Sequence, residues 1–163
     1  MIWRRQWDDP PTFLDAIRDE ILRRASSEPS YYSRNVGGWR SRDDFFDWPS
    51  EEVNLLRRRC GEAVAEVHAT HQVRPFKYRA WAIVNRAGSY HQRHVHGESV
   101  WSGIYYVDAG GTPSARTIFE IDDALVHVEP TPGLMVIFPS PIFHSVEPHH
   151  GNGNRITIAF DAQ

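Results

Sequence analysis

The chain has 163 residues, of which 40% are apolar and 24% are charged, and its formal net charge is −3. This length suits one domain with its own core, and the composition is that of an ordinary soluble globular protein. No block of Lys and Arg residues forms a nucleic-acid footprint, and no apolar run could span a bilayer, so neither kind of partner is expected. Cys60 is alone, so no intrachain disulfide is possible, and the N-terminal residues lack the apolar core of a signal peptide. A reducing cytoplasm is therefore the expected location.

The first half of the chain predicts two amphipathic helices. Asp9 and the two prolines after it form a helix start, and apolar residues at helical spacing then continue to about Arg24. A second start at Ser50 is followed by two glutamates in the first turn, and its helical spacing continues to about Ala69. These helices make up most of a helical N-terminal part that we expect over residues 1–75.

From residue 76 onward, short runs rich in β-branched and aromatic residues alternate with turn signals. The runs predict eight strands: Phe76–Asn85, Ser89–Val95, Val100–Val107, Ala115–Ile121, Leu125–Val128, Leu134–Phe138, Phe143–Glu147 and Arg155–Phe160. Eight short strands after two helices indicate a mainly β fold, an antiparallel double-sheet barrel of the jelly-roll or cupin type with the helices packed outside. We therefore expect a single domain over residues 1–163, with the barrel at 76–163.

The second predicted strand carries an unusual row of polar side chains. His94 and His96 are two residues apart, so on a strand both imidazoles face the same space, and Tyr90 and Gln92 share that parity. Four polar side chains on an inward face are unusual for a plain core, and they indicate a face that surrounds a metal ion or a polar ligand. His91 has the opposite parity and is expected to face outward.

Later residues extend this candidate site. His144 begins a distant strand, and three imidazoles from two strands can occupy one face of a metal octahedron. Glu98 is the nearest carboxylate and competes with His96 for the third position, but it follows a glycine where the strand is expected to break, so His96 is preferred. Arg155 faces inward with Thr157 on the last strand, and a buried guanidinium suits a carboxylate ligand. Each residue alone fits an ordinary hydrogen-bonded histidine or a structural ion pair, whereas together they favour a metal site.

These residues resemble the Fe(II)/2-oxoglutarate-dependent oxygenase superfamily, whose pattern is H-x-D/E, a distant histidine, and then Arg-x-Ser/Thr. The corresponding segments of this chain are residues 94–96, residue 144 and residues 155–157. A bacterial and phage branch of that superfamily, with H-x-H in the first position, is more similar still. Its further motifs resemble the sequences S-G-I-Y-Y at 102–106, G-L-M-V-I-F-P-S at 133–140 and S-R-N-V-G-G-W-R-S at 33–41.

The resemblance implies a double-stranded β-helix that binds Fe(II) and 2-oxoglutarate and uses O2 to oxidise a substrate. It implies that His94 and His144 are iron ligands and that His96 occupies the carboxylate position. It also implies that Arg155 and Thr157 hold the distal carboxylate of 2-oxoglutarate.

The resemblance also leaves weaker assignments and open alternatives. Asn85 and Tyr105 are expected to assist the cosubstrate from neighbouring strands. A neutral imidazole at position 96 leaves the site one negative charge short, although imidazole still suits iron, copper, zinc or nickel. Two other classes therefore stay open: a three-histidine cupin-like dioxygenase that uses no 2-oxoglutarate, and a non-enzymatic barrel that holds a small acid near a metal.

The expected substrate is a small molecule, such as an amino acid or a natural-product intermediate, because only short loops surround the predicted barrel. Tyr90, Gln92 and Trp101 are candidate substrate contacts. Trp81, Trp101 and Phe119 are candidate pocket walls, although core packing is the more common fate of such aromatic residues. A symmetric homodimer is the commonest assembly for a soluble enzyme and is the default expectation.

Overall fold

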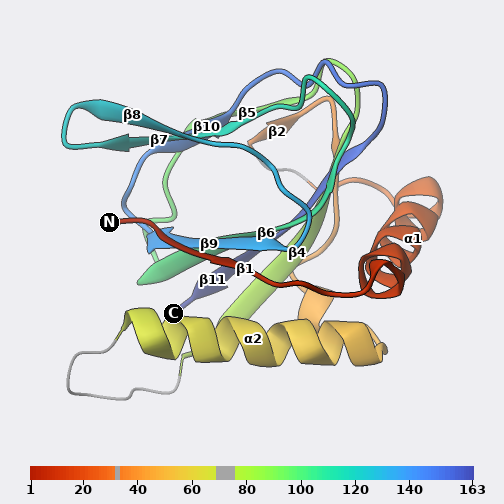
Figure 1. The fold of residues 1–163 in the computed structure, drawn as a ribbon, viewed down its shortest axis with the longest axis horizontal. Helices are drawn as coiled ribbons and strands as arrows, with labels where there is room; N and C mark the ends of the chain where they lie inside the picture. The colour runs from red at the N-terminus through yellow and green to blue at the C-terminus, as the bar shows by residue number, and fades with distance from the viewer. Residues whose placement is uncertain (32–33, 69–75) are drawn as a thin grey trace.

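Two antiparallel sheets face each other across the interior of the protein, as Figure 1 shows. The structure is a computed structural model, and it describes residues 1–31, 34–68 and 76–163. The six-stranded sheet has the order β1 (Trp3–Gln6), β9 (Leu134–Pro139), β6 (Trp101–Ala109), β11 (Arg155–Ala162), β4 (Tyr78–Asn85) and β3 (Trp39–Arg40). The five-stranded sheet has the order β2 (Asn35–Val36), β5 (Tyr90–His94), β10 (His144–Val146), β7 (Thr117–Ile121) and β8 (Ala124–Val128). Antiparallel strands that alternate between inward and outward side chains give the barrel an interior that side chains can line.

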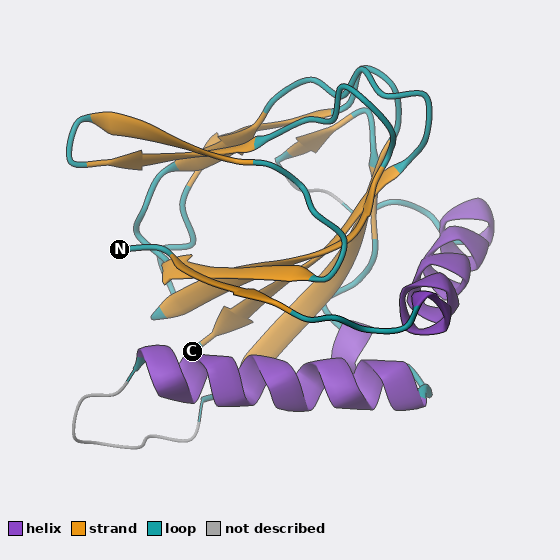
Figure 2. Ribbon diagram, viewed as in Figure 1, coloured by secondary structure: helices purple, strands orange, loops and turns teal. Residues whose placement is uncertain are grey.

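Two helices, α1 (Pro11–Ser27) and α2 (Glu51–Val67), pack on the outer face of the six-stranded sheet (Figure 2). A short 3-10 helix, η1 (Phe45–Asp47), precedes α2. The side chain of Ser50 caps α2 by accepting a hydrogen bond from the backbone N–H of Val53 at 3.3 Å. The apolar stripes of both helices are buried against the sheet, and this packing fixes the sheet from behind.

The central strand β11 separates this helix-side core from the barrel interior. Ile156, Ile158 and Phe160 are fully buried in the core that the helices cover. Arg155 and Thr157, with alternate parity, line the interior instead. The last strand therefore carries apolar anchors on one face and polar groups on the other.

All eight predicted strands are confirmed, each within a few residues of its expected bounds. The prediction that residues 1–75 are helical was incomplete, because β1, β2 and β3 also lie there and join both sheets. These are short edge strands of two to four residues, and their side chains do not alternate in the way that reveals a strand in a sequence. The predicted end of the second helix at Ala69 and the residue Ser33 lie outside the described residues.

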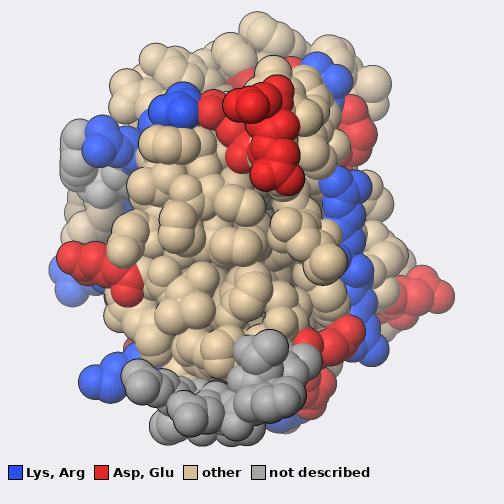
Figure 3. Space-filling view, turned by 90° about the vertical axis from the view of Figure 1, so that its left-hand side faces the viewer, with Lys and Arg blue, Asp and Glu red and all other residues tan. Residues whose placement is uncertain are grey.

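The surface carries charges of both signs. Figure 3 shows acidic side chains gathered near the upper edge of one face and basic side chains along one side, with uncharged atoms between them. Among the described residues, no helix is both long enough and apolar enough to cross a membrane.

Candidate metal centre

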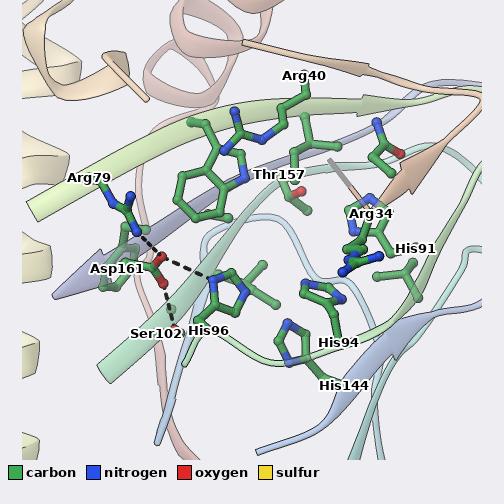
Figure 4. Close-up of a pocket in the computed structure, with 18 of the residues that line it drawn as sticks. Arg34, Arg40, Arg79, His91, His94, His96, Ser102, His144, Thr157 and Asp161 are labelled. Carbon is green, nitrogen blue, oxygen red and sulfur yellow. Dashed lines mark hydrogen bonds and ion pairs between the residues drawn. The ribbon is translucent and has the colours of Figure 1, made fainter. Parts of the chain in front are cut away.

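A pocket with a volume of about 360 Å³ lies between the two sheets, and Figure 4 shows its lining. Residues from strands far apart in the sequence contribute polar groups to it. They include Arg34, Arg40, Arg79, Trp81, His91, His94, His96, His144, Arg155, Thr157 and Asp161.

Three of the predicted residues come together at one place in this pocket. His94 ends β5, His144 begins β10, and the register of these two strands sets the residues opposite each other. His96 lies just beyond the end of β5, and the potential ligand atoms of the three imidazoles lie within 4.8 Å of one another. Glu98 is exposed and does not belong to this group, so the arrangement favours His96 as the third member.

The hydrogen bonds of the three imidazoles determine which nitrogen faces the pocket. Nδ1 of His94 bonds the carbonyl oxygen of Gln92 at 2.7 Å, and Nδ1 of His144 bonds the carbonyl oxygen of Ile142 at 3.1 Å. Nδ1 of His96 bonds a carboxylate oxygen at 3.1 Å. Because these oxygens accept hydrogen bonds, each Nδ1 carries a proton, which leaves Nε2 as the nitrogen that can bind a metal. Three Nε2 lone pairs in one cluster fit a divalent transition metal.

The protonation of these imidazoles also suits a metal. Burial, with a smaller contribution from His94, lowers the pKa of His144 to about 3. Burial likewise lowers the pKa of His94. Both rings are therefore neutral near pH 7, which is the form that binds a metal.

The carboxylate beside His96 belongs to Asp161, which the sequence analysis missed. It is 1% exposed, and it also accepts a hydrogen bond of 2.7 Å from the hydroxyl of Ser102. Burial raises the pKa of Asp161, but the hydrogen bonds and charges of His96, Ser102 and Arg79 outweigh it and hold the pKa below its usual value. Asp161 lies four residues beyond Thr157 on β11. Because the separation is even, both side chains are on the same face of the strand and both line the pocket.

Arg155 is buried and lacks an anionic partner. It is 1% exposed, and its guanidinium donates to the carbonyl oxygen of Ala115 at 3.0 Å, Oδ1 of Asn85 at 3.3 Å and Oγ1 of Thr117 at 3.1 Å. A guanidinium has five N–H groups, and the hydroxyl of Tyr106 also interacts with it, so these contacts leave at least one N–H group for another acceptor. Among the described residues, no carboxylate lies within ion-pair distance of it. Burial lowers the pKa of Arg155, which reflects the cost of a charge held in this setting.

The predicted residues around Arg155 fall into two groups. Thr157 lines the pocket together with Arg155, and Asn85 approaches the guanidinium as one of its acceptors. Tyr105 does not: it packs in the helix-side core, with its hydroxyl 3.5 Å from Asp9. Its neighbour Tyr106 has the opposite parity, and its ring centroid lies 5.4 Å from the Arg155 guanidinium carbon.

The predicted parity of β5 was wrong because the strand contains a bulge. Three residues of β10, from His144 to Val146, pair with four residues of β5, from His94 to His91. The extra residue shifts the alternation, so His91 faces the pocket and Gln92 is exposed. Tyr90 is partly buried and does not line the pocket.

The prediction for Trp101 was also wrong, because it lies on the helix face of β6 and donates a hydrogen bond of 3.2 Å to His68. The aromatic wall of the pocket is Trp81, whose ring stacks on His96 with centroids 5.8 Å apart. Arg40 covers this tryptophan, with its guanidinium carbon 4.5 Å from the ring centroid. Neither Arg40 nor Arg79 carries a sequence signal that distinguishes it from an ordinary surface arginine.

His91, which was predicted to face outward, adds a polar group to the pocket. Its Nε2 is buried and has no hydrogen-bond partner in the described part of the chain. Burial, together with the charge of Arg155, holds the pKa of His91 well below its usual value. The ring is therefore neutral, and it lies near both Arg155 and the other pocket histidines.

A family described as "Putative 2OG-Fe(II) oxygenase" matches residues 79–127 and 112–161 of this chain. The matched segments together cover about half of the sequence and include all the pocket histidines, Arg155 and Asp161. No curated protein matches the chain.

Solved structures of similar fold cover nearly the whole chain. A prolyl-4-hydroxylase from Pseudomonas putida is 17% identical, with a TM-score of 0.81, and the match covers 99% of this chain and 91% of that one. SnoN, a non-heme alpha ketoglutarate dependent epimerase from nogalamycin biosynthesis, is 10% identical, with a TM-score of 0.79 and coverage of 99% and 77%. The viral collagen prolyl hydroxylase of Paramecium Bursaria Chlorella virus-1, in complex with 2OG, is 10% identical, with a TM-score of 0.68 and coverage of 99% and 94%. These likenesses confirm the predicted double-stranded β-helix fold.

Proposed function

Because the chain belongs to the 2OG-Fe(II) oxygenase family, we propose that it is a hydroxylase that uses Fe(II), 2-oxoglutarate and O2 to oxidise a small molecule. The observation that carries this proposal is the pairing, in one pocket, of a three-histidine cluster with a buried arginine that lacks an anion. A metal-binding cluster alone would also suit other chemistry, and the arginine gives the pocket a second, separate anchor for a dicarboxylate.

His94, His96 and His144 would hold Fe(II) through their Nε2 atoms. Three protein ligands leave coordination positions for a cosubstrate and O2. When bound, Fe(II) and 2-oxoglutarate supply the oxidising power of the reaction, and the protein supplies binding, orientation and electrostatics.

Arg155 and Thr157 would hold the distal carboxylate of 2-oxoglutarate. The guanidinium N–H groups that have no protein acceptor can donate to it, and this contact would supply the counter-charge that the buried arginine lacks. Asn85 acts through Arg155, because its side-chain oxygen fixes one end of the guanidinium. Asn85 is in turn held by Asn35, which accepts a hydrogen bond of 2.9 Å.

The charges of the pocket favour a substrate that carries a carboxylate. The lining contains four arginines, Arg34, Arg40, Arg79 and Arg155, against two aspartates, Asp43 and Asp161, which leaves an excess of two positive charges. Fe(II) and the 2-oxoglutarate dianion cancel each other, so the excess persists when both are bound. A substrate with a carboxylate would therefore be attracted to the pocket.

An anaerobic titration with Fe(II) and then 2-oxoglutarate tests the proposal, with the visible metal-to-cosubstrate charge-transfer band as the readout. The band is expected in the wild type and should be lost in His144→Ala. Succinate release on admission of O2, with a panel of amino acids, then tests hydroxylation and the substrate class. If iron binds but 2-oxoglutarate gives no band, the chemistry is that of a three-histidine centre without this cosubstrate, and the proposal is refuted.

A further inference from the structure

We propose that Asp161 supplies, through His96, the negative charge that the metal site lacks at position 96. This inference rests on the proposed function, because it concerns how the same three histidines hold Fe(II). The H-x-D/E pattern of the wider superfamily that the sequence resembles has a carboxylate where this chain has His96, so relative to that pattern the three imidazoles are one negative charge short. A carboxylate is nevertheless close to this position: that of Asp161 lies on the Nδ1 side of the His96 imidazole.

The carboxylate of Asp161 is fixed on both of its oxygens. Oδ2 accepts from Nδ1 of His96 at 3.1 Å, and Oδ1 accepts from the hydroxyl of Ser102 at 2.7 Å (Figure 4). Ser102 is itself bonded to the hydroxyl of Ser140 at 2.8 Å. Only 2% of the Asp161 side chain is exposed, so its position is set by packing and hydrogen bonds.

The other two imidazoles bond backbone carbonyl oxygens instead of a carboxylate. His94 and His144 each donate from Nδ1 to a carbonyl oxygen two residues earlier in the chain, and a carbonyl carries no net charge. Of the three histidines, His96 is thus the one with a carboxylate acceptor, and it is also the one that replaces a carboxylate. The negative charge of Asp161 is therefore next to the position that lacks a carboxylate.

The hydrogen bond has two consequences for a bound metal. It keeps the proton on Nδ1, so the lone pair of Nε2 stays available, and it makes that nitrogen a stronger donor. The neutral imidazole and its carboxylate together carry one negative charge, as a directly bound carboxylate would. Asp161 is thus a positioning residue that acts through His96.

Arg79 provides a matched control, because it contacts the same carboxylate from the other side. Its Nη2 lies 3.6 Å from Oδ2 of Asp161, and 42% of its side chain is exposed. If Asp161 mattered only as half of this ion pair, removal of either partner should have the same effect. If Asp161 acts through His96, removal of Arg79 should leave metal binding intact.

Titration of the full chain with Co(II) against a competing chelator measures the dissociation constant without any need for turnover. We expect Asp161→Asn to weaken Co(II) binding about 10- to 100-fold. Arg79→Met should change it less than about fivefold, as for an exposed ion pair. Ser102→Ala keeps the charge but loosens the carboxylate, so a smaller loss in the same direction is expected; this variant keeps the test decisive if Asp161→Asn does not fold.

A second pair of variants tests the charge itself. His96→Asp restores a direct carboxylate ligand, so Asp161 becomes a superfluous like charge beside it. Asp161→Asn should then leave Co(II) binding unchanged or strengthen it, the reverse of its effect in the wild-type background. Equal losses in both backgrounds, or no loss in the wild-type background, would overturn the inference while leaving the metal centre in place. A wild-type protein that binds no Co(II) would refute the metal centre and with it this inference.

Discussion

Replacing Arg155 with methionine should raise the dissociation constant for 2-oxoglutarate steeply while preserving most of the side-chain volume. Arg155 is 1% exposed, so a carboxylate bound to its guanidinium is removed from water and depends on it for compensation. Truncating one member of a buried, hydrogen-bonded charge pair costs about 2–5 kcal/mol. At 1.4 kcal/mol per factor of ten, this corresponds to roughly 30- to 4,000-fold weaker binding of the cosubstrate.

The lower part of this range is the better expectation, because 2-oxoglutarate can still bind the metal through its other end. The amplitude of the charge-transfer band in the anaerobic Fe(II) protein gives the dissociation constant directly. Metal affinity without 2-oxoglutarate should not change, since the partners of the Arg155 guanidinium in the described part of the chain are Asn85, Ala115 and Thr117, and not the three metal-site histidines.

Tyr105→Phe is the control for this experiment. Its hydroxyl lies on the helix side of the sheet near Asp9, so its loss should leave the 2-oxoglutarate affinity unaltered. Because methionine leaves the acceptors of Arg155 without their donor, the thermal unfolding of each variant must be measured alongside. A folded Arg155→Met protein whose affinity falls less than threefold would refute the role assigned to Arg155.

Two further predictions concern stability. The pKa of His144 is about 3 in the folded state and 6.5 ordinarily, so between these values the unfolded chain binds one more proton at this residue. The free energy of unfolding of the metal-free protein should therefore fall by about 1.4 kcal/mol per unit as the pH drops through this window. The free energy of unfolding, measured by urea denaturation at several pH values, should depend less steeply on pH in His144→Gln than in the wild type. An equal dependence on pH in the two proteins would contradict the pKa shift. Gly103→Ala should destabilise the protein by roughly 1–3 kcal/mol or more, because its Cβ would lie 2.1 Å from Cζ of Phe160; an unchanged melting temperature would show that the ring can move.

The strands were predictable because their periodicity and turn signals are local properties of the sequence. The histidine cluster was predictable for a similar reason: His94 and His96 are close in sequence, and His144 begins a recognisable strand. The resemblance to a known family then connected these residues to Arg155. What the sequence displays directly is thus the arrangement of polar groups along each strand.

The errors arose where one residue changes the face of a strand. The bulge in β5 turns His91 inward and Gln92 outward, and pairing with β10 creates it, so β5 alone gives no sign of it. The choice of Tyr105 over Tyr106 likewise depended on a parity that the sheet sets. Asp161 was missed because the last strand was expected to end one residue before it. Its role depends on a contact across 65 residues with His96, which no local pattern reveals.

Both anchors of the proposed cosubstrate sit on hydrogen-bonded strands. Arg155 starts β11, which is paired on both edges with β4 and β6, while His94 and His144 lie opposite each other in the facing sheet. Neither anchor can approach the other without breaking a ladder of backbone hydrogen bonds. The distance between the two anchors is therefore fixed, and it sets the length of the dicarboxylate that can reach both. We expect it to discriminate against dicarboxylic oxo acids that are one methylene shorter or longer than 2-oxoglutarate, since these could reach one anchor but not both.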